Sequence, residues 1–190
     1  MGRGCCVQDD NAVLRRYPEE RPLGADEGLW WVVRTRTNCE KIIATYLRNR
    51  GISYYIPLYR KKERIGCFGR IRVTDVPLLR GYVCMALERR RHHLLYDSKK
   101  WIRVIEVPDQ RQFVQELEYI EQALVKDVDA IVSPGLVSGK KVIVRSGPLQ
   151  GVQGVYLKRR RGAQIGLRAT LFNQSVNVWL DPYTRLEPID

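Results

Sequence analysis

A glycine-punctuated segment, residues 139–156, constrains the fold of this chain more than any other. It carries an alternating apolar run through Val142 and Val144, a turn at Gly147 and Pro148, and then a second alternating run that begins at Val155. Alternation with a period of two is typical of β-strands, and glycine with proline is typical of the turn that joins them. The segment therefore predicts a β-hairpin that opens a small barrel.

The charge of the chain is strongly positive and unevenly distributed. Among its 190 residues the net charge is +12, with −2 on residues 1–29, +9 on residues 30–125 and +6 on residues 137–190. Two basic segments that each look folded favour a polyanionic partner, although general solubility would explain some of this charge. We find no run of 18 apolar residues and no apolar signal core at the N-terminus, so we expect a cytoplasmic protein without a membrane partner.

The titratable residues give no sign of catalysis. Five cysteines occur without a CxxC spacing, and the two histidines, His92 and His93, are adjacent and have no ligand-spaced partner. The acidic residues form no paired cluster with a histidine, and no nucleophile and base stand at a telling spacing. We therefore expect no metal, no cofactor and no enzyme activity, and a nuclease is the weakest of the alternatives.

The pattern of apolar residues predicts an N-terminal domain over residues 30–125, preceded by a flexible leader at 1–29. Trp30–Arg34 is expected to be a strand, followed by a helix that Asn38 caps and Gly51 ends. Further strands are expected at residues 52–59, 82–87 and 101–107, with a basic hairpin at 60–72 and a helix capped by Asp109. This order predicts an antiparallel sheet sandwiched with helices.

The rest of the chain predicts a second, all-β domain. Residues 126–138 are expected to be a linker, and residues 139–190 to fold as a small five-stranded barrel. Its strands are expected at residues 140–145, 152–158, 167–172, 175–180 and 184–187. The predicted fold class of the whole chain is therefore α+β.

Three segments in order resemble the NusG/RfaH family of transcription elongation factors. They are Trp30–Val33 with the helix after it, Pro77–Val83, and the glycine-rich stretch Gly147–Gly154. The resemblance covers roughly residues 30–190. It implies an N-terminal NGN domain followed by a C-terminal KOW domain, which in this family is an SH3-like β-barrel. Leu79 and Arg80 stand where the family usually has Phe-Pro, which favours a specialised antiterminator paralogue over the general factor.

The resemblance also implies where partners bind. An apolar patch rimmed by charge is expected to bind the clamp helices of the largest RNA polymerase subunit. The residues predicted for this patch are Leu79, Tyr82 and Cys84. The alternative is that the side chains of this strand belong to the core.

Two further sets of residues are predicted to bind partners. Contacts with nucleic acid are expected from Arg34, Arg36, Lys41, Lys158, Arg159, Arg160 and Arg161, although solvated surface charge is the alternative. The pair Leu171 and Phe172 is expected to dock a ribosomal protein of the small subunit or a termination factor, with a place in the barrel core as the alternative.

The function that we predict is regulation of transcript elongation by a monomer that binds RNA polymerase and reduces pausing or termination. The KOW domain would recruit a ribosomal protein, a termination factor or RNA or DNA. The main alternative is a KOW-containing protein that associates with the ribosome or binds RNA, but this leaves the N-terminal domain without a role.

Overall fold

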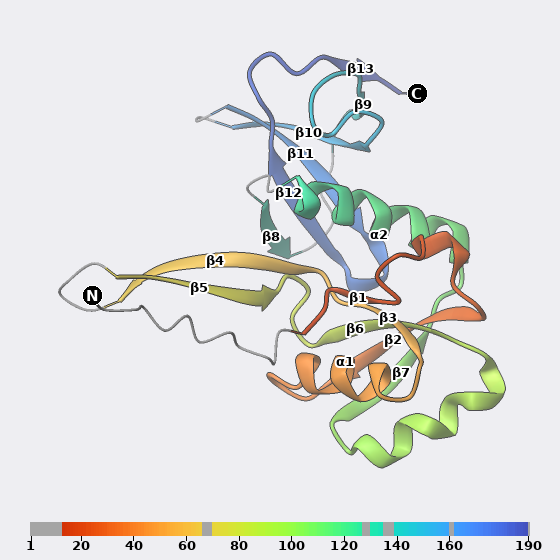
Figure 1. The fold of residues 1–190 in the computed structure, drawn as a ribbon. Helices are drawn as coiled ribbons and strands as arrows, with labels where there is room; N and C mark the ends of the chain where they lie inside the picture. The colour runs from red at the N-terminus through yellow and green to blue at the C-terminus, as the bar shows by residue number, and fades with distance from the viewer. Residues whose placement is uncertain (1–12, 66–69, 127–129, 135–138, 160–161, 190) are drawn as a thin grey trace.

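The computed structural model describes residues 13–65, 70–126, 130–134, 139–159 and 162–189, which form two antiparallel sheets and a separate two-stranded ribbon (Figure 1). The first, which we call the N-terminal sheet, has the strand order β1-β3-β6-β2-β7. Its strands are β1 Arg16–Tyr17, β2 Leu29–Thr35, β3 Ser53–Tyr55, β6 Tyr82–Leu87 and β7 Trp101–Glu106.

The apolar residues of β6 alternate between the two faces of the N-terminal sheet. Val83, Met85 and Leu87 join a cluster with α1 (Glu40–Arg48), whereas Cys84 and Ala86 join a cluster with α2 (Gln110–Val125). A strand with both faces covered has no polar side, which explains why residues 82–87 form an unbroken apolar run. The predicted sandwich of helices and an antiparallel sheet is confirmed.

The two helices begin in different ways. Asp109 caps α2 as predicted, and its Oδ1 accepts a hydrogen bond from the backbone N–H of Gln112 at 2.9 Å. The prediction that Asn38 caps α1 is wrong, because Asn38 has a positive φ of 57° and Cys39 occupies the cap position without a side-chain hydrogen bond. Gly51 follows α1 with φ of 65°, as expected for a glycine that ends a helix.

The predicted strand 52–59 is divided in two. β3 ends at Tyr55, and β4 (Leu58–Ile65) begins after Pro57, which cannot donate to a continuing ladder. β4 pairs only with β5 (Arg70–Pro77), and this ribbon projects away from both sheets (Figure 1). Residues 66–69, in the middle of the basic hairpin predicted at 60–72, lie outside the described residues.

The predicted leader is partly folded. Within residues 13–29, β1 pairs with β3, and the 3-10 turn η1 (Leu23–Ala25) buries Leu23 against the α2 face of the sheet. Isolated apolar residues between charges gave no periodic signal, so the sequence did not reveal this packing. A second 3-10 segment, η2 (Arg89–Ser98), connects β6 to β7.

The second sheet, which we call the C-terminal sheet, has six strands in the order β13-β9-β10-β11-β12-β8. They are β8 Ala130–Pro134, β9 Lys141–Val144, β10 Gln153–Arg159, β11 Gly162–Ala169, β12 Gln174–Trp179 and β13 Leu186–Pro188. One strand more than predicted is present because β8, in the segment expected to be a linker, pairs with the edge of β12. The expected strand 167–172 instead ends at Ala169 and passes into the 3-10 turn η3 (Thr170–Phe172).

The hairpin predicted from residues 139–156 is confirmed. β9 and β10 pair antiparallel, and the connection between them uses the positive φ angles of Gly147 (86°) and Gly151 (88°). Gly154 serves a different purpose, since a Cβ there would lie 2.8 Å from the carbonyl oxygen of Gly166. The glycines therefore allow one tight turn and one close approach of neighbouring strands.

Candidate functional site

Tyr82 begins β6 at the rim of the N-terminal sheet, where a glycine turn fixes its position. Gly81 has φ of 79°, and its N–H donates to Oε1 of Glu40 at 2.5 Å. A Cβ on Gly81 would lie 3.0 Å from the Arg34 guanidinium, which itself stacks 4.4 Å from the centre of the Tyr82 ring. This stacking is a cation–π contact, and it holds one face of the half-buried Tyr82 ring.

Another side of Tyr82 meets the C-terminal sheet. The ring of Phe172, in η3, lies 5.0 Å from the Tyr82 ring at an interplanar angle of 69°, an edge-to-face arrangement. Phe172 also lies 6.1 Å from Phe113 of α2, and it is only 7% exposed. Residues of β6, α2 and η3 thus form one aromatic cluster, and we call the surface on which they meet the docking interface.

Hydrogen bonds reinforce the docking interface along α2. The carboxylate of Glu116 accepts from the backbone N–H of Thr170 at 2.8 Å and from its hydroxyl at 2.5 Å. About two turns further along the helix, Nε2 of Gln122 donates to the carbonyl oxygen of Gln150 at 3.2 Å. The C-terminal sheet is therefore attached to α2 at two points as well as through the aromatic cluster.

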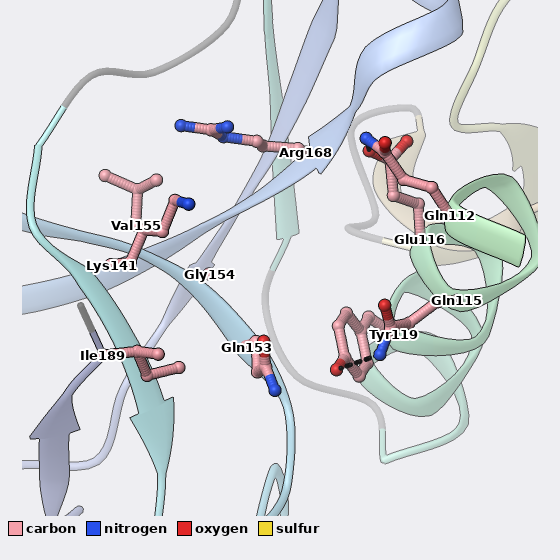
Figure 2. Close-up of a pocket in the computed structure, with 10 residues that line it drawn as sticks. All are labelled: Gln112, Gln115, Glu116, Tyr119, Lys141, Gln153, Gly154, Val155, Arg168 and Ile189. Atoms are coloured by element: carbon pink, nitrogen blue, oxygen red, sulfur yellow. Dashed lines mark hydrogen bonds between the residues drawn. The ribbon is translucent and has the colours of Figure 1, made fainter. Parts of the chain in front are cut away.

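A cavity of about 370 Å³ opens beside the docking interface. Figure 2 shows α2 on one side of it, with the Gln115 amide bonded to the Tyr119 hydroxyl, and strands of the C-terminal sheet on the other. Its lining residues are Gln112, Gln115, Glu116, Tyr119, Lys141, Gln153, Gly154, Val155, Arg168 and Ile189. The cavity shows that the docking interface closes around the aromatic cluster but not along its whole length.

The three residues predicted to bind polymerase differ in accessibility. Tyr82 is half-buried, whereas Leu79 is 0% exposed and Cys84 is 1% exposed. Burial raises the pKa of the Cys84 thiol, as expected for a core cysteine. Cys84, in β6, and Leu79, in the turn before β6, both pack in the α2-side cluster, so in this arrangement they present no surface to a partner.

The predicted nucleic-acid residues of the N-terminal domain do not form one patch of free cations. Arg36 is exposed and Lys41 is half-buried, but Arg34 is held against Tyr82. In the C-terminal sheet, Lys158 and Arg159 end β10, whereas Arg160 and Arg161 lie outside the described residues. The prediction that these cations bind nucleic acid remains a prediction.

The docking interface uses residues that the sequence did not single out. Leu171 is half-buried and lies next to Phe172 in η3. The contacts that Phe113, Glu116 and Thr170 make at the docking interface were not predicted. The sequence shows that Phe113 belongs to the apolar face of the helix capped by Asp109, but nothing in the sequence indicates which domain covers that face. An exposed-looking Glu116 on an amphipathic helix gives no signal at all.

Within the described residues, no three His, Cys, Asp or Glu side chains come together as a metal site would require. In the same part of the chain, no helix has the length and apolar character needed to cross a membrane.

Comparisons with known proteins give one family. Residues 28–129 match the family model described as transcription termination factor nusG. A solved structure of Thermotoga maritima NusG, described in terms of its domain interaction, has 18% identity and a TM-score of 0.47, covering 85% of this chain and 97% of that one. The MjSpt4:Spt5 complex has 15% identity and a TM-score of 0.29, with coverage of 85% and 97%. A search of curated proteins found no match.

Proposed function

Because the matched residues 28–129 make up more than half of the chain, the protein belongs to the NusG family, and from this premise we propose how it regulates transcription. Membership places it among factors that act in transcription elongation. We propose that its N-terminal domain binds the clamp helices of the largest RNA polymerase subunit and reduces pausing or termination. Tyr82 would be the anchor of this contact.

The contact between Tyr82 and Phe172 suggests that the two partner-binding surfaces are coupled. The sequence predicts Tyr82 to bind polymerase and Phe172 to bind a second partner, yet their rings lie against each other at 5.0 Å. A closed arrangement therefore withholds both surfaces, and opening of the docking interface would release both together. Such coupling would let polymerase binding and recruitment of the second partner favour the same open state.

In the open state, the C-terminal sheet would act as the KOW domain of the family and recruit a ribosomal protein, a termination factor or RNA. Leu171 and Phe172 would supply an apolar contact, and the run from Lys158 to Arg161 would supply cations for phosphates. The net charge of +6 on residues 137–190 supports RNA as one of the candidates. None of these steps requires a catalytic residue.

Loosening the docking interface should strengthen polymerase binding. Glu116→Ala removes two hydrogen bonds to Thr170, which should shift the balance toward the open state by about 1–2 kcal/mol in free energy. The apparent affinity of the full chain for core RNA polymerase should then rise by roughly five- to thirtyfold at most, because the binding-competent fraction rises. Biolayer interferometry with immobilised polymerase would measure this change.

Two variants complete the experiment. Glu118→Ala removes the same charge from an exposed position on α2, so it should leave the affinity unchanged. Tyr82→Ala combined with Glu116→Ala should cancel the gain, since an interface hot spot is worth about 2–4 kcal/mol. If Glu116→Ala and Glu118→Ala bind polymerase alike, the docking interface does not restrict binding. If the double variant binds as well as Glu116→Ala, Tyr82 is not the anchor.

A further inference from the structure

The ribbon formed by β4 and β5 is attached to the body of the protein only at its base. Leu58 is 1% exposed, and the N–H of Leu78 donates to the carbonyl oxygen of Pro57 at 2.7 Å, so the two strands leave the core together. From there they pair over eight positions, from Leu58 opposite Pro77 to Ile65 opposite Arg70. Two strands without a third or a covering helix are only marginally stable by themselves.

The pairing register gives the ribbon two different faces. Residues directly opposite each other in an antiparallel pair point to the same side, and successive residues alternate. On the first face, Arg60 lies opposite Asp75, Lys62 opposite Val73 and Arg64 opposite Ile71. On the second face, the opposed pairs include Tyr59 with Val76, Lys61 with Thr74 and Glu63 with Arg72.

The cations of the two faces have different surroundings. On the second face, Lys61 forms an ion pair with Glu63, and the pKa of Glu63 is lowered by this hydrogen bond and the charge of Lys61, with a smaller contribution from Arg72. On the first face, Lys62 and Arg64 have no ion pair with any other described residue. The acid of the first face, Asp75, lies opposite Arg60 near the base of the ribbon, so Lys62 and Arg64, which lie further out, are available to a ligand, whereas Lys61 on the second face is paired with Glu63.

The first face also exposes two aliphatic side chains beside its cations. Val73 is 54% exposed and Ile71 is 65% exposed, although β-branched residues of this kind normally lie in a core. A strip with exposed cations on one strand and exposed aliphatic side chains on the other contributes little to folding. This strip is complementary to a ligand that presents a row of anionic groups next to apolar groups.

We propose that the first face of the ribbon binds B-form duplex DNA, with the ribbon seated in the major groove. That groove is about 12 Å wide and admits a two-stranded β-ribbon, whose strands lie about 4.8 Å apart. Lys62 and Arg64 would contact phosphates, and Val73 and Ile71 would face the base edges, where thymine presents its methyl group. The major groove of A-form RNA is too narrow for such a ribbon, which makes DNA the ligand.

Two variants with equal charge loss test the proposal on the full-length protein. Lys62→Gln with Arg64→Gln removes two cations from the first face, and Lys61→Gln with Arg72→Gln removes two from the second. Binding to a 20-base-pair DNA duplex would be followed by fluorescence anisotropy across a series of salt concentrations. Each phosphate contact contributes about −0.9 to the log–log salt slope, so the first variant should flatten the slope by about 2 and the second should not change it.

Three results would overturn the proposal. The first is an equal loss in both variants, which would indicate a diffuse charge effect. The second is unchanged DNA binding by the first variant, and the third is equally tight, equally face-dependent binding of an RNA duplex of the same sequence. Val73→Thr gives an independent check, since it keeps a β-branched residue; it should weaken DNA binding severalfold without changing the salt slope. Polymerase is absent from these measurements, so their outcome is separate from that of the proposed function.

Discussion

The two hydrophobic clusters of this protein lie on opposite faces of the N-terminal sheet and differ in what completes them. The α1-side cluster contains Ile43, Leu47, Val83 and Met85, and all its members come from the N-terminal domain. The α2-side cluster includes Phe113 and Leu117 of α2 but continues without a break into Phe172 of η3 and Val176 of β12. The α1 side of the sheet is thus covered by residues of the N-terminal domain alone, whereas the α2 side is covered by residues of both domains.

This difference indicates where the molecule can change its arrangement. A cluster completed within one domain is lost only when that domain unfolds, whereas a cluster shared between domains can be divided by separating them. The short connection from Val125, which ends α2, to Ala130, which begins β8, keeps the two parts close even when separated. The α2 side is therefore the side on which regulation is expected.

The largest effect should come from a cavity in the α1-side cluster. Leu47 is 0% exposed, so Leu47→Ala should lower the free energy of unfolding by about 4 kcal/mol, through lost burial and an unfilled cavity. Urea denaturation followed by tryptophan fluorescence would measure the loss, because Trp31 belongs to this cluster. A loss below about 1 kcal/mol would show that the cluster tolerates repacking and is not the independent core of the domain.

A smaller and different effect is expected at Phe172. Phe172→Ala should cost about 3 kcal/mol, the lower end for a buried phenylalanine, since part of its surroundings lies across the docking interface. The main consequence should be separation of the domains, seen as a larger radius of gyration in small-angle scattering while circular dichroism stays unchanged. Loss of β-sheet signal instead would show that Phe172 is essential to the core of the C-terminal sheet.

The sequence predicted those parts of the fold whose signals are local. The β9–β10 hairpin followed from its glycines, the start of α2 from Asp109, and the strand β6 from its apolar run. Prediction failed where a distant partner decides the outcome. β8 is a strand because β12 offers it an unpaired edge, and Leu23 is buried because α2 lies above it.

Two residues of the candidate site were named from the sequence, but their arrangement was not predicted. Tyr82 and Phe172 were both identified, but as contacts for two separate partners. Their mutual contact depends on how two domains pack, which no periodicity within either segment encodes. Leu79 and Cys84 were assigned to a surface by the family resemblance, and the alternative that side chains of this strand belong to the core describes their burial here.

The smallest effect should come from Asp26, a carboxyl group at the edge of the α2 side next to η1. Its side chain is 2% exposed, and desolvation raises its pKa, opposed by a hydrogen bond with Ser53 and by the charges of Arg16 and Arg21. A carboxyl group with a raised pKa in the folded state is less favourable when ionised, so its cost to stability is present at neutral pH. That cost disappears as the pH falls through the folded-state pKa.

Asp26→Asn should therefore stabilise the protein at pH 7 by less than about 1 kcal/mol. Thermal unfolding at several pH values should show the advantage shrinking toward acid pH, while Glu19→Gln, which removes an exposed carboxylate, shows no such trend. An advantage that instead grows toward acid pH would mean that ionised Asp26 stabilises the fold through Arg16 and Arg21, and the α2 side would then tolerate a buried charge.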